Sequence, residues 1–202
     1  MGHLGAPARG SIRDGVSAVN RSDWITHLER IGNPSGAAVP LLPPDPTLLA
    51  GTRGEQRLWR LCSDPAAEQP AAGNTIAEVL GDRRGALLAP DAFLAIEVWA
   101  ECELAALHAL HRLSRGSADA RLRDRVHEAV RWHLEHTQPD NSTNRPWALH
   151  VFLLADDAVC GGSGDAAFYA ETLLHNMSAT EARNEPLSRW ILADAARELR
   201  LA

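Results

Sequence analysis

A short pattern in the C-terminal half of the sequence recurs at a fixed offset of 40 residues, and this recurrence constrains the fold more than any other feature. Each copy runs from the end of one helical stretch, through a polar loop, to an Asn-x-Pro start of the next stretch. Two helical hairpins in the same register place their long loops at the same end of the molecule. The matched positions are Leu134 and Leu174, Asn144 and Asn184, and Pro146 and Pro186.

Five long helical stretches are predicted from residue 90 onward, because apolar residues recur at helical spacing between Pro and Gly interruptions. Their alternating short and long connections favour an antiparallel helical bundle or stacked helical hairpins. A helical solenoid needs about three copies of such a unit, and two are visible, so a closed bundle is favoured. No segment alternates like a strand, and the predicted fold class is all-α. The predicted helices cover residues 91–114, 119–136, 146–157, 165–177 and 186–199.

The first third of the chain is irregular and rich in Pro and Gly. Residues 1–20 lack periodicity and are predicted to form a flexible arm. Residues 21–89 are predicted to contain short helices and an extended segment that wraps around the core of residues 90–202. The extended segment follows from four prolines between positions 40 and 46, which exclude a helix there. Its expected apolar anchors are Leu41, Leu42, Leu48 and Leu49, and the expected short helices cover residues 22–30, 55–62 and 75–80.

Composition excludes several functional classes. All 20 basic residues are Arg, so phosphate binding by a P-loop lysine and Schiff-base chemistry are excluded. The net charge is -6 and no basic stripe is present, so no nucleic acid is expected as a partner. The longest apolar run, residues 147–155, is interrupted by His150, so no membrane span is predicted, and residues 1–13 lack a signal-peptide pattern. A cytoplasmic protein is expected, and the Arg-only, Ala-rich composition is typical of a GC-rich bacterial genome.

The cysteines and the recognisable motifs point to no established chemistry. Three scattered cysteines fit neither a disulfide framework nor a zinc knuckle. The sequence His127–Arg131 begins like a zinc-protease motif, but Arg131 stands where the second histidine ligand is required. His108 and His111 are one turn apart and could chelate, although a role in a helix interface is the favoured interpretation.

Helix direction predicts a site at one end of the bundle. If the five helices alternate in direction, four histidines and two glutamates converge there, together with polar loops that could orient a substrate. Imidazoles and carboxylates on facing helices suit Zn, Fe or Mn, and also suit acid-base catalysis. The candidate metal ligands are Glu97, Glu101, His136 and His175, and the candidate catalytic residues are His133, His150, Asn141 and Arg145.

A structural role is the alternative for several of these residues. His136 and His175 end predicted helices, where a side chain that donates hydrogen bonds interacts favourably with free carbonyls. His133 and His150 share faces with apolar residues, and a buried histidine most often bonds to a backbone carbonyl. We therefore expect a helical scaffold or protein-interaction domain that binds a protein partner or a second copy of itself. The alternative is a metal-assisted or acid-base enzyme that uses the Glu/His pocket.

Overall fold

The computed structural model describes residues 20–64, 71–81, 85–90, 94–137, 144–160 and 164–202. All regular structure in this part of the chain is helical, so the predicted all-α class is confirmed. Residues 1–19 of the predicted arm, Asn141 and residues 161–163 lie outside the described residues, whereas Asn20, the last residue of the predicted arm, caps α1. The helices are α1 Arg21–Gly32, α2 Pro46–Ala50, α3 Gly54–Ser63, α4 Ala71–Leu80, α5 Ile96–Gly116, α6 Ala120–His136, α7 Leu149–Cys160, α8 Asp165–Ala179, the 3-10 turn η2 Glu181–Asn184 and α9 Pro186–Leu201.

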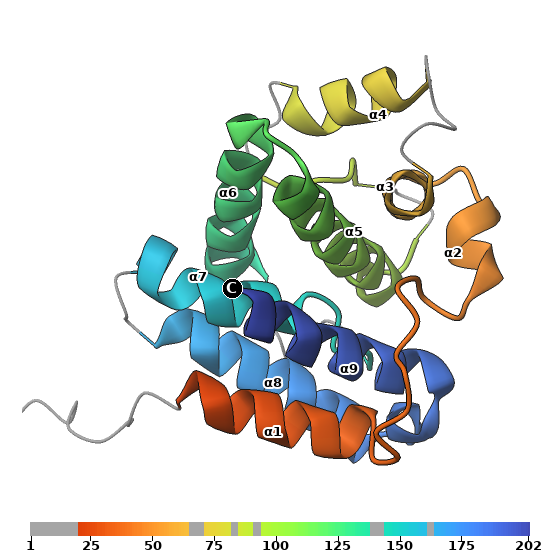
Figure 1. Cartoon of the computed structure of the whole chain (residues 1–202). Coiled ribbons are helices and arrows are strands. Elements are labelled where there is room, and N and C mark those ends of the chain that lie inside the picture. Colours follow the sequence, from red (N-terminus) through yellow and green to blue (C-terminus); the bar gives the residue numbers. More distant parts are fainter. Residues whose placement is uncertain (1–19, 65–70, 82–84, 91–93, 138–143, 161–163) are drawn as a thin grey trace, which may run out of the picture.

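Figure 1 shows how the helices are arranged. α5 and α6 form a hairpin whose upper end is capped by α4, and α3 packs against α5. α1 and α9 run side by side below this hairpin, and α7 packs on α8. None of the described helices is long and apolar enough to cross a membrane.

The α1 and α9 helices pack closely because Gly32 ends α1. A Cβ atom at Gly32 would lie 2.7 Å from the backbone nitrogen of Ala193 and 2.8 Å from the carbonyl oxygen of Arg189. No larger residue fits without moving the α9 backbone. Trp24 and Leu28 are the buried side chains of α1. An ion pair between Arg200 and Glu29 also joins the two helices.

The proline-rich segment contacts α9, and part of it is helical where the sequence predicts an extended chain. The indole nitrogen of Trp190 donates to the carbonyl of Pro40 at 2.9 Å, which fixes the segment on α9. Pro46–Ala50 forms the helix α2 because Pro46 occupies its first turn, where proline is favoured, and Asp45 caps it. Leu48 is buried as predicted, whereas Leu41 is exposed.

Two of the long helices begin later than the sequence predicts. α5 begins at Ile96 instead of residue 91, and α7 begins at Leu149 instead of residue 146. The start of α7 is displaced because Ala148 has a φ of 56°, in the left-handed region. An L-residue with a side chain pays a steric cost in this region, so it interrupts a right-handed helix. The remaining long helices agree with prediction to within two residues at each end.

Candidate functional site

The four predicted metal ligands do not come together. Glu97 and His175 are exposed on α5 and α8. His136 is also exposed; its ring stacks on Trp132 at 5.2 Å and its Nδ1 donates to the Trp132 carbonyl at 3.0 Å. Within the described chain, no group of three His, Cys, Asp or Glu side chains is placed to hold a metal ion. The hydrogen bond of His136 is the structural role expected of a histidine at a helix end.

The predicted catalytic histidines lie in different buried groups. His150 contacts His108 and His111, with ring centroids 4.5 Å and 4.9 Å away, and its Nε2 lies 3.2 Å from Nδ1 of His111. His133 instead contacts Glu103 and Thr137. Both His133 and His150 are fully buried, so neither imidazole is accessible to a substrate in this conformation.

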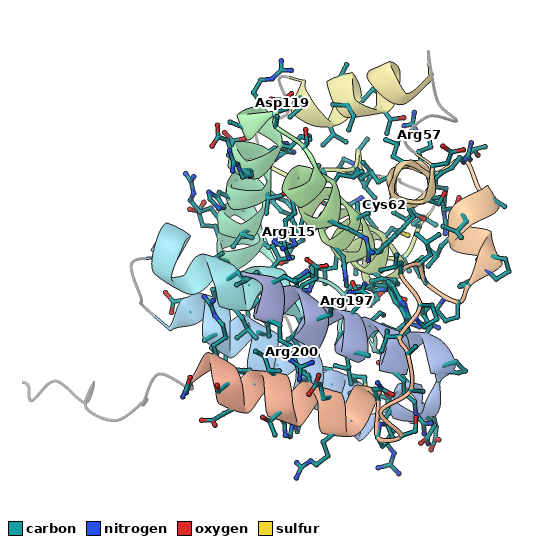
Figure 2. The ribbon with its side chains drawn as sticks, in the orientation of Figure 1. Arg57, Cys62, Arg115, Asp119, Arg197 and Arg200 are labelled. Carbon is teal, nitrogen blue, oxygen red and sulfur yellow. The ribbon has the colours of Figure 1, made fainter. Side chains whose placement is uncertain are left out.

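The first buried group, here named the Asp194 cluster, joins α5 to α9. Its centre is the fully buried carboxylate of Asp194. Nε2 of His108 lies 2.9 Å from this carboxylate and Nη1 of Arg112 lies 3.1 Å from it, while Arg197 pairs with it from within α9. One turn further along α9, Arg115 pairs with Glu198 at 2.6 Å. Figure 2 labels both arginines: Arg115 reaches from α5 to Glu198 on α9, whereas Arg197 pairs with Asp194 within α9.

The strained residue Ala148 belongs to the same cluster. Its backbone N–H donates to Nδ1 of His108 at 3.4 Å. Nδ1 is therefore the acceptor nitrogen of a neutral imidazole, and Nε2 carries the hydrogen that is donated to Asp194. The positive φ of Ala148 turns its N–H away from the helix direction and toward His108. Trp59, Trp147 and Trp190 surround the His108 ring.

The second buried group, here named the Glu103 cluster, joins α5 to α6. Both Glu103 oxygens accept backbone N–H groups, from Leu87 and, at 2.7 Å, from Leu88. Nε2 of His133 lies 3.8 Å from Glu103 Oε1, too far for a hydrogen bond, and has no other partner among the described atoms. Nδ1 of His133 lies 3.1 Å from the hydroxyl of Thr137.

Burial sets the charge states in both clusters. It lowers the pKa of His108, His111 and His133 to about 3 and moves the pKa of His150 well below its usual value. It raises the pKa of Glu103 to about 7, against the opposing effect of the two backbone N–H groups. The four imidazoles are therefore neutral at pH 7. These shifts follow from desolvation, so they describe structural groups as readily as catalytic ones.

Two predicted residues, Glu101 and Arg145, do lie in a pocket. The cavity, of about 320 Å³, lies between α2, α3, α5, the segment before α7 and the start of α9. Arg145 pairs with Glu101 and, at 2.9 Å, with Glu185. Arg145 and Glu185 are 40 residues apart, the same offset that recurs in the sequence. The apolar lining residues are Leu48, Val98, Ala105, Trp147 and Leu187, and the remaining polar ones are Asp45, Thr47, Arg53, Glu55 and Cys102.

The first turn of α3 forms the wall between this cavity and a second one of about 410 Å³, which extends toward α4 and Trp99. Arg53, Glu55 and Cys102 line both cavities. Burial and the neighbouring Glu55 carboxylate together raise the pKa of Cys102 to about 11, so the thiol is protonated. A protonated thiol is a poor nucleophile. Neither cavity has a histidine among its described lining residues.

Sequence reasoning missed the residues that organise these sites. Asp194 lies on the apolar face of α9 between Ile191 and Ala195, and an acidic residue on such a face was a usable signal. Glu55 gave no comparable signal, because an acidic residue in the first turn of a helix is ordinary. Its burial depends on packing between α3 and α5, which one sequence does not reveal.

Comparison with known proteins identifies no relative. No family model matches the chain, and neither the curated proteins nor the solved structures give a match.

Proposed function

We propose that this chain is a helical partner-binding protein that recognises another protein through the first turns of α5 and the 320 Å³ cavity beside them. The observation that carries the proposal is the exposure of apolar side chains at this place. Ile96 is 64% exposed and Val98 is 45% exposed, and Val98 also lines the cavity. Exposed apolar residues beside a concave site are typical of surfaces that bind a protein segment.

The cavity has the composition of a recognition site. Leu48, Trp147 and Leu187 supply apolar walls from three separate elements, and the Glu101–Arg145 pair supplies charge. An anchor side chain that fills such a cavity would bury apolar surface at the centre of an interface, where most binding energy is found. The chain therefore offers both a pocket for an anchor residue and an apolar surface around it.

Catalysis has weaker support. The histidines that sequence analysis assigned to catalysis are fully buried, and the described cavity linings contain a protonated thiol but no imidazole. Metal-assisted or acid-base chemistry would need a different conformation to expose His133 or His150.

A peptide-library selection against the immobilised full chain tests the proposal. We expect selected peptides to lose at least about tenfold in affinity for a Val98→Glu variant, because a charge replaces an apolar contact at the cavity rim. Phe168→Glu is the matched control, since Phe168 on α8 is 66% exposed and lies outside the cavity lining. Peptides that bind the Val98→Glu and Phe168→Glu variants equally well, or a selection without any binder, would contradict the proposal.

A further inference from the structure

The cavity beside α5 has a surplus of negative charge. Three carboxylates and two guanidinium groups line it, a formal charge of -1, and Glu185 adds another carboxylate next to Arg145. Arg145 is already shared between Glu101 and Glu185. The lining carboxylates are Asp45, Glu55 and Glu101, and the lining guanidinium groups are those of Arg53 and Arg145. The balance favours a cationic occupant over an anionic one.

Glu55 supplies the second, independent observation. Its residue is 2% exposed, yet its Oε1 accepts no hydrogen bond from the described atoms. The Nε of Arg53 is 2.7 Å away, so the two groups form an ion pair whose N–H does not point at this oxygen. A buried carboxylate oxygen without a donor is costly, because it has lost water without gaining a full replacement. A ligand with N–H groups would restore the missing hydrogen bond.

A ligand can displace the Arg53 side chain from Glu55. The Arg53 side chain is 53% exposed, in contrast to the buried Glu55 that it covers. Because Glu55 is buried, loss of Arg53 alone would leave its charge uncompensated, so the half-exposed Arg53 side chain can move into water only when another cation takes its place. The Arg53 backbone remains fixed, because its N–H donates to Oε1 of Gln56 at 3.1 Å.

We propose that the cavity binds a Lys or Arg side chain of the protein partner, whose cationic group displaces Arg53 and donates hydrogen bonds to Glu55. The aliphatic stem of that side chain packs against Leu48, Val98 and Leu187 at the mouth of the cavity. This inference rests on the proposed partner-binding function and specifies the chemistry that the cavity recognises. Charge complementarity with a chain of net charge -6 also speeds association with a basic segment.

A direct binding experiment uses N-acetyl-arginine amide as the probe and the full chain as the receptor. We expect saturable shifts of the Gly54 and Glu55 backbone amide signals in NMR spectra, because both residues lie next to the displaced Arg53 side chain. N-acetyl-norleucine amide has a similar aliphatic stem without the charge, and it should cause no saturable shift. The absence of saturation with the arginine probe, or equal binding of both probes, would overturn the inference.

Two substitutions should change the affinity for the arginine probe in opposite directions. Glu55→Gln should weaken binding by about tenfold, since it removes a charge-assisted hydrogen bond. Arg53→Ala should strengthen binding by about threefold, since the probe no longer competes with an internal guanidinium group. The matched controls are Glu135→Gln and Arg121→Ala, which make the same changes of side chain at exposed positions on α6 and should leave the affinity unchanged.

Because Arg53→Ala is expected to strengthen probe binding, this variant alone tests the inference if Glu55→Gln does not fold. Weaker or unchanged probe binding by Arg53→Ala would show that a ligand cation does not take the place of Arg53, and would reject the inference alone. Selected peptides that depend on Val98 but not on a basic residue would also reject it, while the partner-binding function would stand. Conversely, probe binding with the expected signs and no selected peptides would reject the function and retain the cation site.

Discussion

The Asp194 cluster and the Glu103 cluster both compensate a buried carboxylate, but they do so with different partners. Each contains a fully buried carboxylate, Glu103 on α5 or Asp194 on α9 facing α5, together with at least one fully buried histidine. Asp194 is surrounded by Arg112, Arg197 and the N–H of His108. Glu103 accepts two backbone N–H groups, and burial raises its pKa to about 7. A carboxylate compensated by guanidinium groups depends on charge, whereas one compensated by neutral donors can take up a proton near neutral pH.

The buried histidines and Glu103 should respond to acid in opposite directions. Histidines whose folded pKa is below 6.5 stabilise the fold above pH 6.5, and this contribution is lost as the pH falls toward 3. Glu103 has a folded pKa above its unfolded value of 4.5, so its contribution is present below pH 4.5 and is lost as the pH rises through 7. His108, His111 and His150 belong to the Asp194 cluster, and His133 belongs to the Glu103 cluster.

The largest expected effect is the loss of stability in acid. Each buried histidine should remove up to about 1.4 kcal/mol of unfolding free energy per pH unit below 6.5, and the four together outweigh the single opposing carboxylate. Urea unfolding of the wild-type chain at pH 7.5, 6.5, 5.5 and 4.5 measures this loss. A stability that stays constant between pH 7.5 and 5.5 would show that the histidines are not held neutral.

The next largest effect is the loss of stability expected when the charge of Asp194 is removed. Asp194→Asn keeps the shape of the side chain but removes the carboxylate that pairs with Arg112 and Arg197, and it should cost about 3–5 kcal/mol of unfolding free energy at pH 7. Urea unfolding at pH 7 is again the measurement, with Glu135→Gln as the control for loss of an exposed carboxylate. A cost below about 1 kcal/mol would mean that solvent already compensates the two arginines.

The sequence predicted the helices better than it predicted these clusters, and the reason is physical. Helical periodicity and capping signals are local, so the ends of α6 were found to within one residue and its cap, Asp119, was included. Which buried side chains meet depends on how α5 packs against α6, α7 and α9, which is not local. His133 and His150 were correctly expected to lie among apolar residues, yet they contact different partners.

The candidate site was predictable where the 40-residue offset applied. Positions 145 and 185 are separated by that offset, and the ion pair between Arg145 and Glu185 lies beside Glu101. Glu97 was expected on the same face as Glu101 but is exposed, one residue into α5. Glu55 lines the cavity from α3, which lies outside the segments related by the 40-residue offset, so the offset could not predict its position.

A third, smaller effect is the change that a Glu103 substitution makes in the pH dependence of stability. Glu103→Gln resembles the protonated carboxyl group and removes a buried group that gains stability in acid. The variant should therefore be relatively more stable at pH 8 than at pH 5 when compared with the wild type. The difference should change by up to about 1.4 kcal/mol per pH unit between pH 7 and 4.5. Parallel urea titrations of both proteins measure it, and a difference that does not change with pH would place the pKa of Glu103 outside this range.

The smallest effect concerns the backbone that orients His108. Ala148→Gly should relieve about 1–2 kcal/mol of left-handed strain, but it loses a buried methyl group worth about 0.8 kcal/mol and adds freedom to the unfolded chain. We expect the unfolding free energy to change by less than about 1 kcal/mol for this reason. Ala148→Val should cost more than about 2 kcal/mol, because a β-branched residue is strained at φ 56° and its extra methyl groups must be accommodated at a fully buried position. Thermal unfolding of both variants at pH 7 tests the pair, and a stable Val variant would mean that Ala148 need not adopt this conformation for its N–H to bind His108.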